Sequence, residues 1–179
     1  RTFQELSPKD ADIILYLVPW LLSVNHPTCP GYVHGLETPI QVANIHRAEA
    51  ILRREGTHKR LFGIGEEGPL LRSTLQANTI LGVYTIGSSG TIAQTEYSDC
   101  DIWLCIDKRQ YSAQGIDQLS QKVNLLKNWL DTQVKLPVYF FLSDVEDIRN
   151  CHFGQVDDES CGTAQKNILR EEFYRTMIV

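Results

Sequence analysis

The stretch TILGVYTIGSSGTIAQTEYSDCDIWLCI, residues 79–106, decides the fold that this sequence predicts. Residues 79–87 are rich in β-branched and aromatic side chains, and they predict a strand. The segment SGTIAQTEY, which begins at Ser89, predicts a short helix, and residues 100–106 predict a second strand. This alternation of strands and a helix favours a sheet with helices packed on it.

The elements expected on either side continue the alternation. Apolar spacing and capping residues predict helices over 7–22, 39–54, 112–132 and 161–178, and a third strand over 136–144. Residues 55–78 predict irregular structure, because GIGEEG at 63–68 lacks the strand and helix that flank a dinucleotide-binding loop. We therefore predict an α/β (α+β) fold, a mixed sheet with packed helices. Residues 1–60 would form a helical N-terminal region packed on a core of residues 75–179, which we expect to be truncated at its C-terminus.

Composition and charge argue against several classes of function. Of the 179 residues, 42% are hydrophobic and 22% are charged, which is typical of a soluble globular domain. The net charge of −5 and the lack of a long basic run argue against a nucleic-acid partner. No apolar run reaches the roughly 18 residues that span a bilayer, so we expect no membrane span. Five scattered cysteines without a C-x-x-C pair favour a reduced, cytoplasmic protein.

Asp99 and Asp101 lie two residues apart at the start of the second predicted strand. Alternate residues of a strand point to the same face, with Cα atoms about 6.5 to 7 Å apart. Both carboxylates therefore face one way, while Cys100 faces the core. Carboxylates this close repel each other unless a proton or a cation relieves the repulsion. Two-metal sites for phosphoryl transfer provide such cations, so the pair predicts a site for two Mg²⁺ ions.

Gly87 and Ser88 end the first predicted strand and begin the short helix. A glycine lets the backbone approach a phosphate, and a helix N-terminus offers free N–H groups. We therefore predict that a nucleotide triphosphate lies on this turn, next to the metals. The alternative is an ordinary strand-to-helix turn beside two solvated aspartates, because each motif alone is common by chance.

A strand that ends in Gly-Ser and is followed closely by Asp-x-Asp resembles the nucleotidyltransferase fold of the DNA polymerase beta superfamily. In that superfamily a third carboxylate lies on a later strand. The resemblance points to Asp144, at the end of the third predicted strand, with Asp147 as the second choice. The alternative for Asp144 is the N-cap of a following helix.

Further blocks are similar to the catalytic region of bacterial class I adenylate cyclases. They are LVPWLLSVNHPTCPGY (17–32), SDCDIW (98–103), VYFFLSDVEDIR (138–149), ESCGTAQ (159–165) and EFYRT (172–176). The resemblance implies that ATP is converted to 3′,5′-cyclic AMP and pyrophosphate. It also implies that the metal ligands are Asp99, Asp101 and Asp144, and that the β- and γ-phosphates are held by Gly87, Ser88 and Ser89. Class I cyclases are far longer than this chain and continue beyond EFYRT.

Lys166 and Arg175 lie on the last predicted helix, and either could reach a triphosphate. The alternative is a solvated face, or ion pairs with Glu171 or Glu172. Two other functions stay open. One is the transfer of a nucleotide to a protein, RNA or small-molecule acceptor, and the other is an inactive nucleotide-binding module. Cyclisation differs from the transfer reaction because it needs no second substrate.

Overall fold

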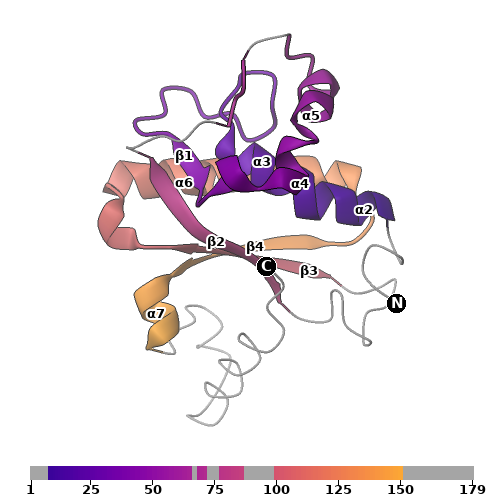
Figure 1. The fold of residues 1–179 in the computed structure, drawn as a ribbon. Helices are drawn as coiled ribbons and strands as arrows, with labels where there is room; N and C mark the ends of the chain where they lie inside the picture. The colour runs from indigo at the N-terminus through magenta and orange to yellow at the C-terminus, as the bar shows by residue number, and fades with distance from the viewer. Residues whose placement is uncertain (1–7, 66–67, 72–76, 87–98, 151–179) are drawn as a thin grey trace.

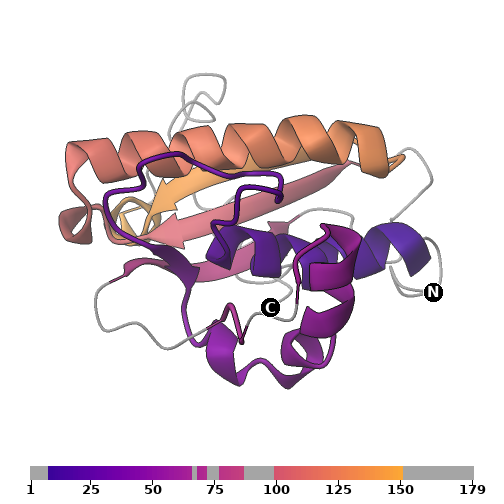
Figure 2. The same ribbon diagram turned by 90° about the horizontal axis from the view of Figure 1, so that it is seen from above.

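The computed structural model describes residues 8–65, 68–71, 77–86 and 99–150. In this part of the chain a four-stranded sheet carries a layer of helices on one face and a short helix on the other (Figures 1 and 2). The predicted α/β class, a mixed sheet with packed helices, is confirmed. None of the described helices is both long and apolar enough to cross a membrane. The helices predicted over 89–97 and 161–178 lie outside the described residues.

The sheet has the strand order β1-β2-β3-β4. Its strands are β1 (Ile40–Val42), β2 (Asn78–Ile86), β3 (Cys100–Ile106) and β4 (Val138–Asp144). β1 runs parallel to β2, β2 antiparallel to β3, and β3 parallel to β4. The three strands predicted from β-branched and aromatic runs are therefore confirmed within one or two residues at their ends.

The helix predicted over residues 39–54 is wrong. Ile40–Val42 is a strand that pairs with Asn78–Ile80, because its two β-branched side chains fit the edge of the sheet. Asn44 then takes a left-handed conformation, with φ of 57°, which no continuous α-helix admits. Shorter helical segments follow: the 3₁₀-helix η2 (Ile45–Arg47), α4 (Glu49–Leu52) and α5 (Glu55–Leu61).

The opening helix is confirmed over the residues that the structure describes. It consists of α2 (Pro8–Asp12), the π-helical segment η1 (Ile13–Leu17) and α3 (Val18–Ser23). The long helix α6 (Ala113–Gln133) follows the 3₁₀-helix η3 (Lys108–Gln110), and α7 (Val145–Arg149) follows β4. The Ser112 hydroxyl caps α6 by accepting from the Gly115 N–H at 2.9 Å.

The burial pattern of β3 shows which face of the sheet meets the helix layer. Cys100, Ile102 and Leu104 are at most 1% exposed, and they belong to one hydrophobic cluster with side chains of α3 and α6. Asp101 and Trp103 alternate with them and are only half-buried. Because neighbouring side chains of a strand point to opposite faces, Asp101 and Trp103 lie on the face away from α3 and α6.

Lys122 is a fully buried cation on α6. Its Nζ donates to the backbone carbonyl oxygens of Val24 at 2.7 Å and Gly31 at 3.1 Å. Burial lowers the pKa of Lys122 to about 8, although the neighbouring Cys29 acts in the opposite direction. Lys122 thus ties α6 to the loop that follows α3.

Candidate functional site

The site is built where the end of β2 meets the start of β3. Ile86, the last residue of β2, pairs with Asp101, the second residue of β3. The chain therefore leaves β2 beside this carboxylate, and Gly87 is the next residue. The predicted phosphate-binding residues are Gly87, Ser88, Ser89, Lys166 and Arg175, and all five lie outside the described residues.

The charge of Asp99 acts on the carboxylate of Asp101. Burial, followed by the neighbouring charge of Asp99, raises the pKa of Asp101 to about 6. Asp99 is exposed at the entrance to β3, whereas Asp101 is half-buried beside Ile86. The structure therefore brings together two of the three predicted metal ligands. A nearby cation would reduce the free-energy cost of charging Asp101.

The structure does not bring Asp144 to this pair. In the parallel pairing of β3 with β4, Asp144 lies beside Ile106, whereas Asp101 lies beside Tyr139. Five residues of strand separate the two positions, or roughly 17 Å at about 3.3 Å per residue. A distance of that size is too long for two carboxylates to share a metal, so the expected third ligand has to be corrected.

Asp144 instead caps the helix that follows it. Its Oδ1 accepts from the Glu146 N–H at 2.7 Å, and its Oδ2 accepts from the Lys108 N–H at 2.8 Å. Burial acts to raise the pKa of Asp144, but these two backbone hydrogen bonds, together with the charge of Lys108 and the Asp147 N–H, hold the pKa below its usual value. Asp147, the second choice, pairs with Lys108 Nζ at 3.0 Å at the same end of the sheet.

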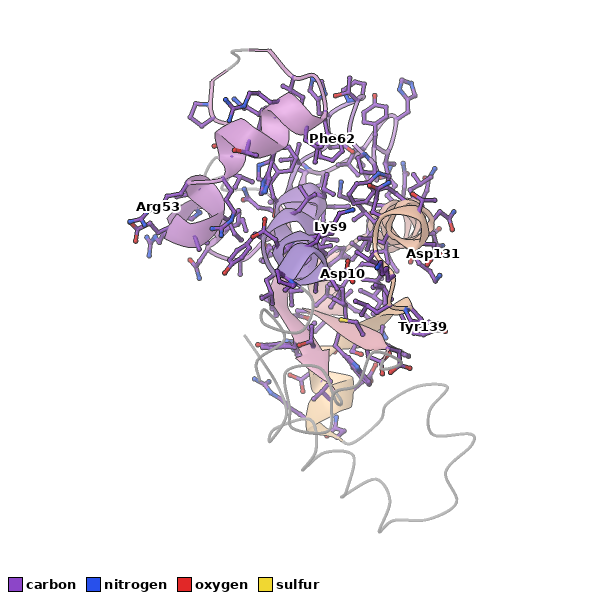
Figure 3. The ribbon with its side chains drawn as sticks, turned by 90° about the vertical axis from the view of Figure 1, so that its right-hand side faces the viewer. Lys9, Asp10, Arg53, Phe62, Asp131 and Tyr139 are labelled. Atoms are coloured by element: carbon purple, nitrogen blue, oxygen red, sulfur yellow. The ribbon has the colours of Figure 1, made fainter. Side chains whose placement is uncertain are left out.

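Tyr139 occupies the position on β4 where a third carboxylate would lie beside Asp101. It is 44% exposed, and Lys127 Nζ lies 5.7 Å from the centre of its ring. Figure 3 shows Tyr139 projecting from the edge of the sheet below the helix that carries Asp131. Sequence reasoning missed this position, because it could be found only from the register of β3 against β4.

Aromatic side chains cover part of the same sheet face. The rings of Trp103 and Phe141 stack with centroids 5.0 Å apart and an angle of 22° between their planes. Trp103 is half-buried on the face that carries Asp101. On the helix layer, Trp129 packs edge-on against Phe62, with ring centroids 5.9 Å apart.

The carboxylates at the site can supply part of the coordination shell of a metal ion. Among the residues that the structure describes, no group of three or more His, Cys, Asp or Glu side chains could bind a metal together. Asp99 and Asp101 can supply two oxygen ligands, and Mg²⁺ usually completes its shell with phosphate oxygens and water. The pair thus suits a cation that arrives with a polyphosphate.

Comparison with known proteins relates this chain to one family. The profile described as adenylate cyclase NT domain matches residues 1–179. An adenylate cyclase of Pasteurella multocida is 33% identical over 168 residues, which cover 92% of this chain and 19% of that protein. Adenylate cyclases of Haemophilus influenzae and Escherichia coli are each 32% identical, over 172 and 169 residues.

The aligned residues cover 92% of this chain and 20% of the Haemophilus protein, and 90% of this chain and 18% of the Escherichia protein. The chain thus spans about a fifth of the length of the curated relatives that it matches. No solved structure matches the chain. Because the family profile covers the chain from its first residue to its last, the chain belongs to the adenylate cyclase NT domain family.

Proposed function

We propose that this chain provides the catalytic site of an adenylate cyclase, which converts ATP to 3′,5′-cyclic AMP and pyrophosphate. The carboxylate pair carries the proposal, because Asp99 and burial together make Asp101 costly to charge without a cation. Relatives that carry the name adenylate cyclase support the reaction. We also interpret residues 75–179 as a nucleotidyltransferase-like core, with residues 1–60 packed on it and supplying β1 to its sheet.

Asp99 and Asp101 are the proposed ligands of two Mg²⁺ ions. When bound, such ions lower the pKa of the ribose 3′-hydroxyl and neutralise charge on the leaving pyrophosphate. The chain itself aligns the substrate, because Asp101 is fixed by its strand pairing with Ile86. Gly87, Ser88 and Ser89 are the proposed phosphate-binding residues next along the chain, and Lys166 and Arg175 are proposed to pair with the triphosphate.

The proposal concerns a protein of the length of these relatives, because this chain spans only about a fifth of that length. It needs no second substrate site, unlike the transfer of a nucleotide to an acceptor. Asp144 has no role in it, since its carboxylate is used at the N-terminus of α7.

Calorimetry of Mg²⁺-ATP binding to the 179-residue chain tests the metal ligands. Asp99→Asn and Asp101→Asn should each weaken binding at least tenfold, while Asp117→Asn on the exposed face of α6 should leave it unchanged. Product analysis of the longer protein with labelled ATP tests the reaction. Pyrophosphate release that required a protein, RNA or sugar acceptor, without cyclic AMP, would refute the cyclase proposal and leave the nucleotidyltransferase fold.

A further inference from the structure

A cavity of about 560 Å³ lies between the helix layer and the sheet, beside β2. Its walls are formed by residues of η1, β1, α4 and β2, and Ile102 of β3 also lines it. Ile102 belongs to the face of the sheet that meets the helix layer, whereas Asp101 lies on the opposite face. The cavity is therefore separate from the proposed metal site.

The lining of the cavity is apolar and partly open to solvent. None of the described residues that line it is charged, and most of them are aliphatic. Leu81 lines the cavity and is 41% exposed, and Ala50, which also lines it, is exposed. A charged ligand would lose its hydration here without gaining a charged partner. Contiguous exposed apolar surface of this kind marks a site of interaction with an apolar group.

The helix that forms one wall departs from α-helical geometry at the cavity. Its segment η1 is π-helical, and the Val18 N–H donates to the carbonyl oxygen of Ile13, five residues earlier. Three successive residues of this segment, Ile14, Leu15 and Tyr16, line the cavity. π-helical turns are rare, and they occur frequently at functional sites. The local geometry of this wall therefore supports a functional role for the cavity.

Charged side chains lie at the rim of the cavity. The guanidinium of Arg54 lies 3.8 Å from the centre of the Tyr16 ring, and its Nη2 lies 3.4 Å from Asp12 Oδ1. Tyr16 lines the cavity, whereas neither Arg54 nor Asp12 does. An apolar centre with a charged rim is the usual arrangement of a surface on which protein packs against protein.

We propose that an apolar segment from the remainder of the same protein docks in this cavity. The aligned residues make up 19% of the Pasteurella relative and 20% of the Haemophilus relative, so about four-fifths of a protein of that length lies outside them. Such a segment is covalently attached, which gives it a high effective concentration at the cavity. The inference does not depend on the proposed reaction.

The size of the cavity favours an attached segment over a second copy of the chain. Sixteen described residues line it, whereas stable associations between separate proteins use roughly 20–30 residues on each side. An attached segment needs less contact, because its association does not carry the full entropic cost of bringing two molecules together. A segment docked here would contact β2, the strand whose last residue pairs with Asp101.

Hydrogen–deuterium exchange of the 179-residue chain and of a protein of the relatives' length, both without nucleotide, tests the inference. Backbone amides of residues 42–51 and 81–85 should exchange at least about tenfold more slowly in the longer protein. Two substitutions in the longer protein should each restore fast exchange: Leu81→Lys brings a charge to the cavity, and Ala48→Leu fills it. Leu125→Lys, at a 39% exposed position on α6, is the matched control and should leave exchange slow. Circular dichroism establishes that each variant folds.

The other outcomes would overturn the inference. Equal exchange of these amides in the two wild-type proteins would mean that no attached segment occupies the cavity. Slow exchange that persists in the folded Ala48→Leu variant would mean that the segment docks elsewhere. Exchange in the 179-residue chain that slows as the protein concentration rises, and that Leu81→Lys makes independent of concentration, would identify a second copy as the occupant. None of these measurements involves Mg²⁺-ATP, so each outcome leaves the proposed function to its own test.

Discussion

Replacing Asp101 with asparagine should stabilise the metal-free protein at neutral pH and change its stability little at pH 4. Burial, followed by the charge of Asp99, raises the pKa of Asp101 from 3.8 to about 6. The folded state therefore binds this proton more tightly than the unfolded chain does. Well below pH 4, Asp101 is protonated in both the folded and the unfolded state, and its burial then carries no cost of charging. The free energy of unfolding then falls as the pH rises from 4 to 6. Above pH 6 the full cost of the charged Asp101 carboxylate is present.

The structure sets the size of this effect. One pKa unit corresponds to about 1.4 kcal/mol, so a rise from 3.8 to about 6 corresponds to at most about 3 kcal/mol. Asp101 is only half-buried, and solvent screening reduces the energy of partly exposed charges. We therefore expect Asp101→Asn to raise the free energy of unfolding by about 1–2 kcal/mol at pH 7. Saturating Mg²⁺-ATP should reverse the order, because only the wild type gains binding energy through this carboxylate.

Urea unfolding of wild type and variant between pH 4 and pH 8, in buffer free of divalent ions, measures the difference. Asp99→Asn should give a smaller gain, since the charge of Asp99 is the second cause of the raised pKa and burial is the first. Asp117→Asn on α6 is the matched control and should change nothing. A gain that is equal at pH 4 and pH 7, or a loss of stability at pH 7, would refute the reasoning.

Three further predictions concern the scaffold and are checked by urea unfolding. Lys122→Met should destabilise by about 2 kcal/mol, because two buried carbonyl oxygens lose their donor at about 1–3 kcal/mol each while the cost of a buried charge disappears. Gly31→Ala should cost at least about 2 kcal/mol, since φ is +82° and the new Cβ would lie 2.8 Å from Leu126 Cγ, whereas Gly35→Ala at φ +63° meets no atom within 4 Å and should cost less. Burial lowers the pKa of His58 below 6.5, so His58→Phe should remove a loss of stability that wild type shows as the pH falls through 6.5.

Local sequence signals predicted most of the sheet. The β-branched and aromatic runs of β2 and β3 identified those strands, because both lie in the middle of the sheet and one face of each is buried. The apolar spacing over residues 112–132 predicted α6, and the Ser112 hydroxyl caps its first turn. These signals are local, so no knowledge of the partners was needed to interpret them.

The errors arose where a distant partner decides the local structure. The apolar side chains of Ile40 and Val42 fit a helical pattern equally well, and pairing with the edge of β2 makes this segment a strand. Asn44 takes a φ of 57° and interrupts the predicted helix, but an asparagine by itself is only a weak sequence signal of such an interruption. The alternation that buries Ile102 turns Trp103 to the opposite face of the sheet, where it is half-buried.

The directions of the strands decide which carboxylates can act together. β2 is antiparallel to β3, so the end of β2 lies beside the start of β3, and the residues after Ile86 begin next to Asp101. β3 is parallel to β4, so the start of β3 lies beside the start of β4, and a carboxylate at the end of β4 lies beside Ile106. Asp144 therefore resembles a ligand by sequence order alone. A third oxygen ligand for the pair must come from the substrate, from water, or from a part of the protein other than β4.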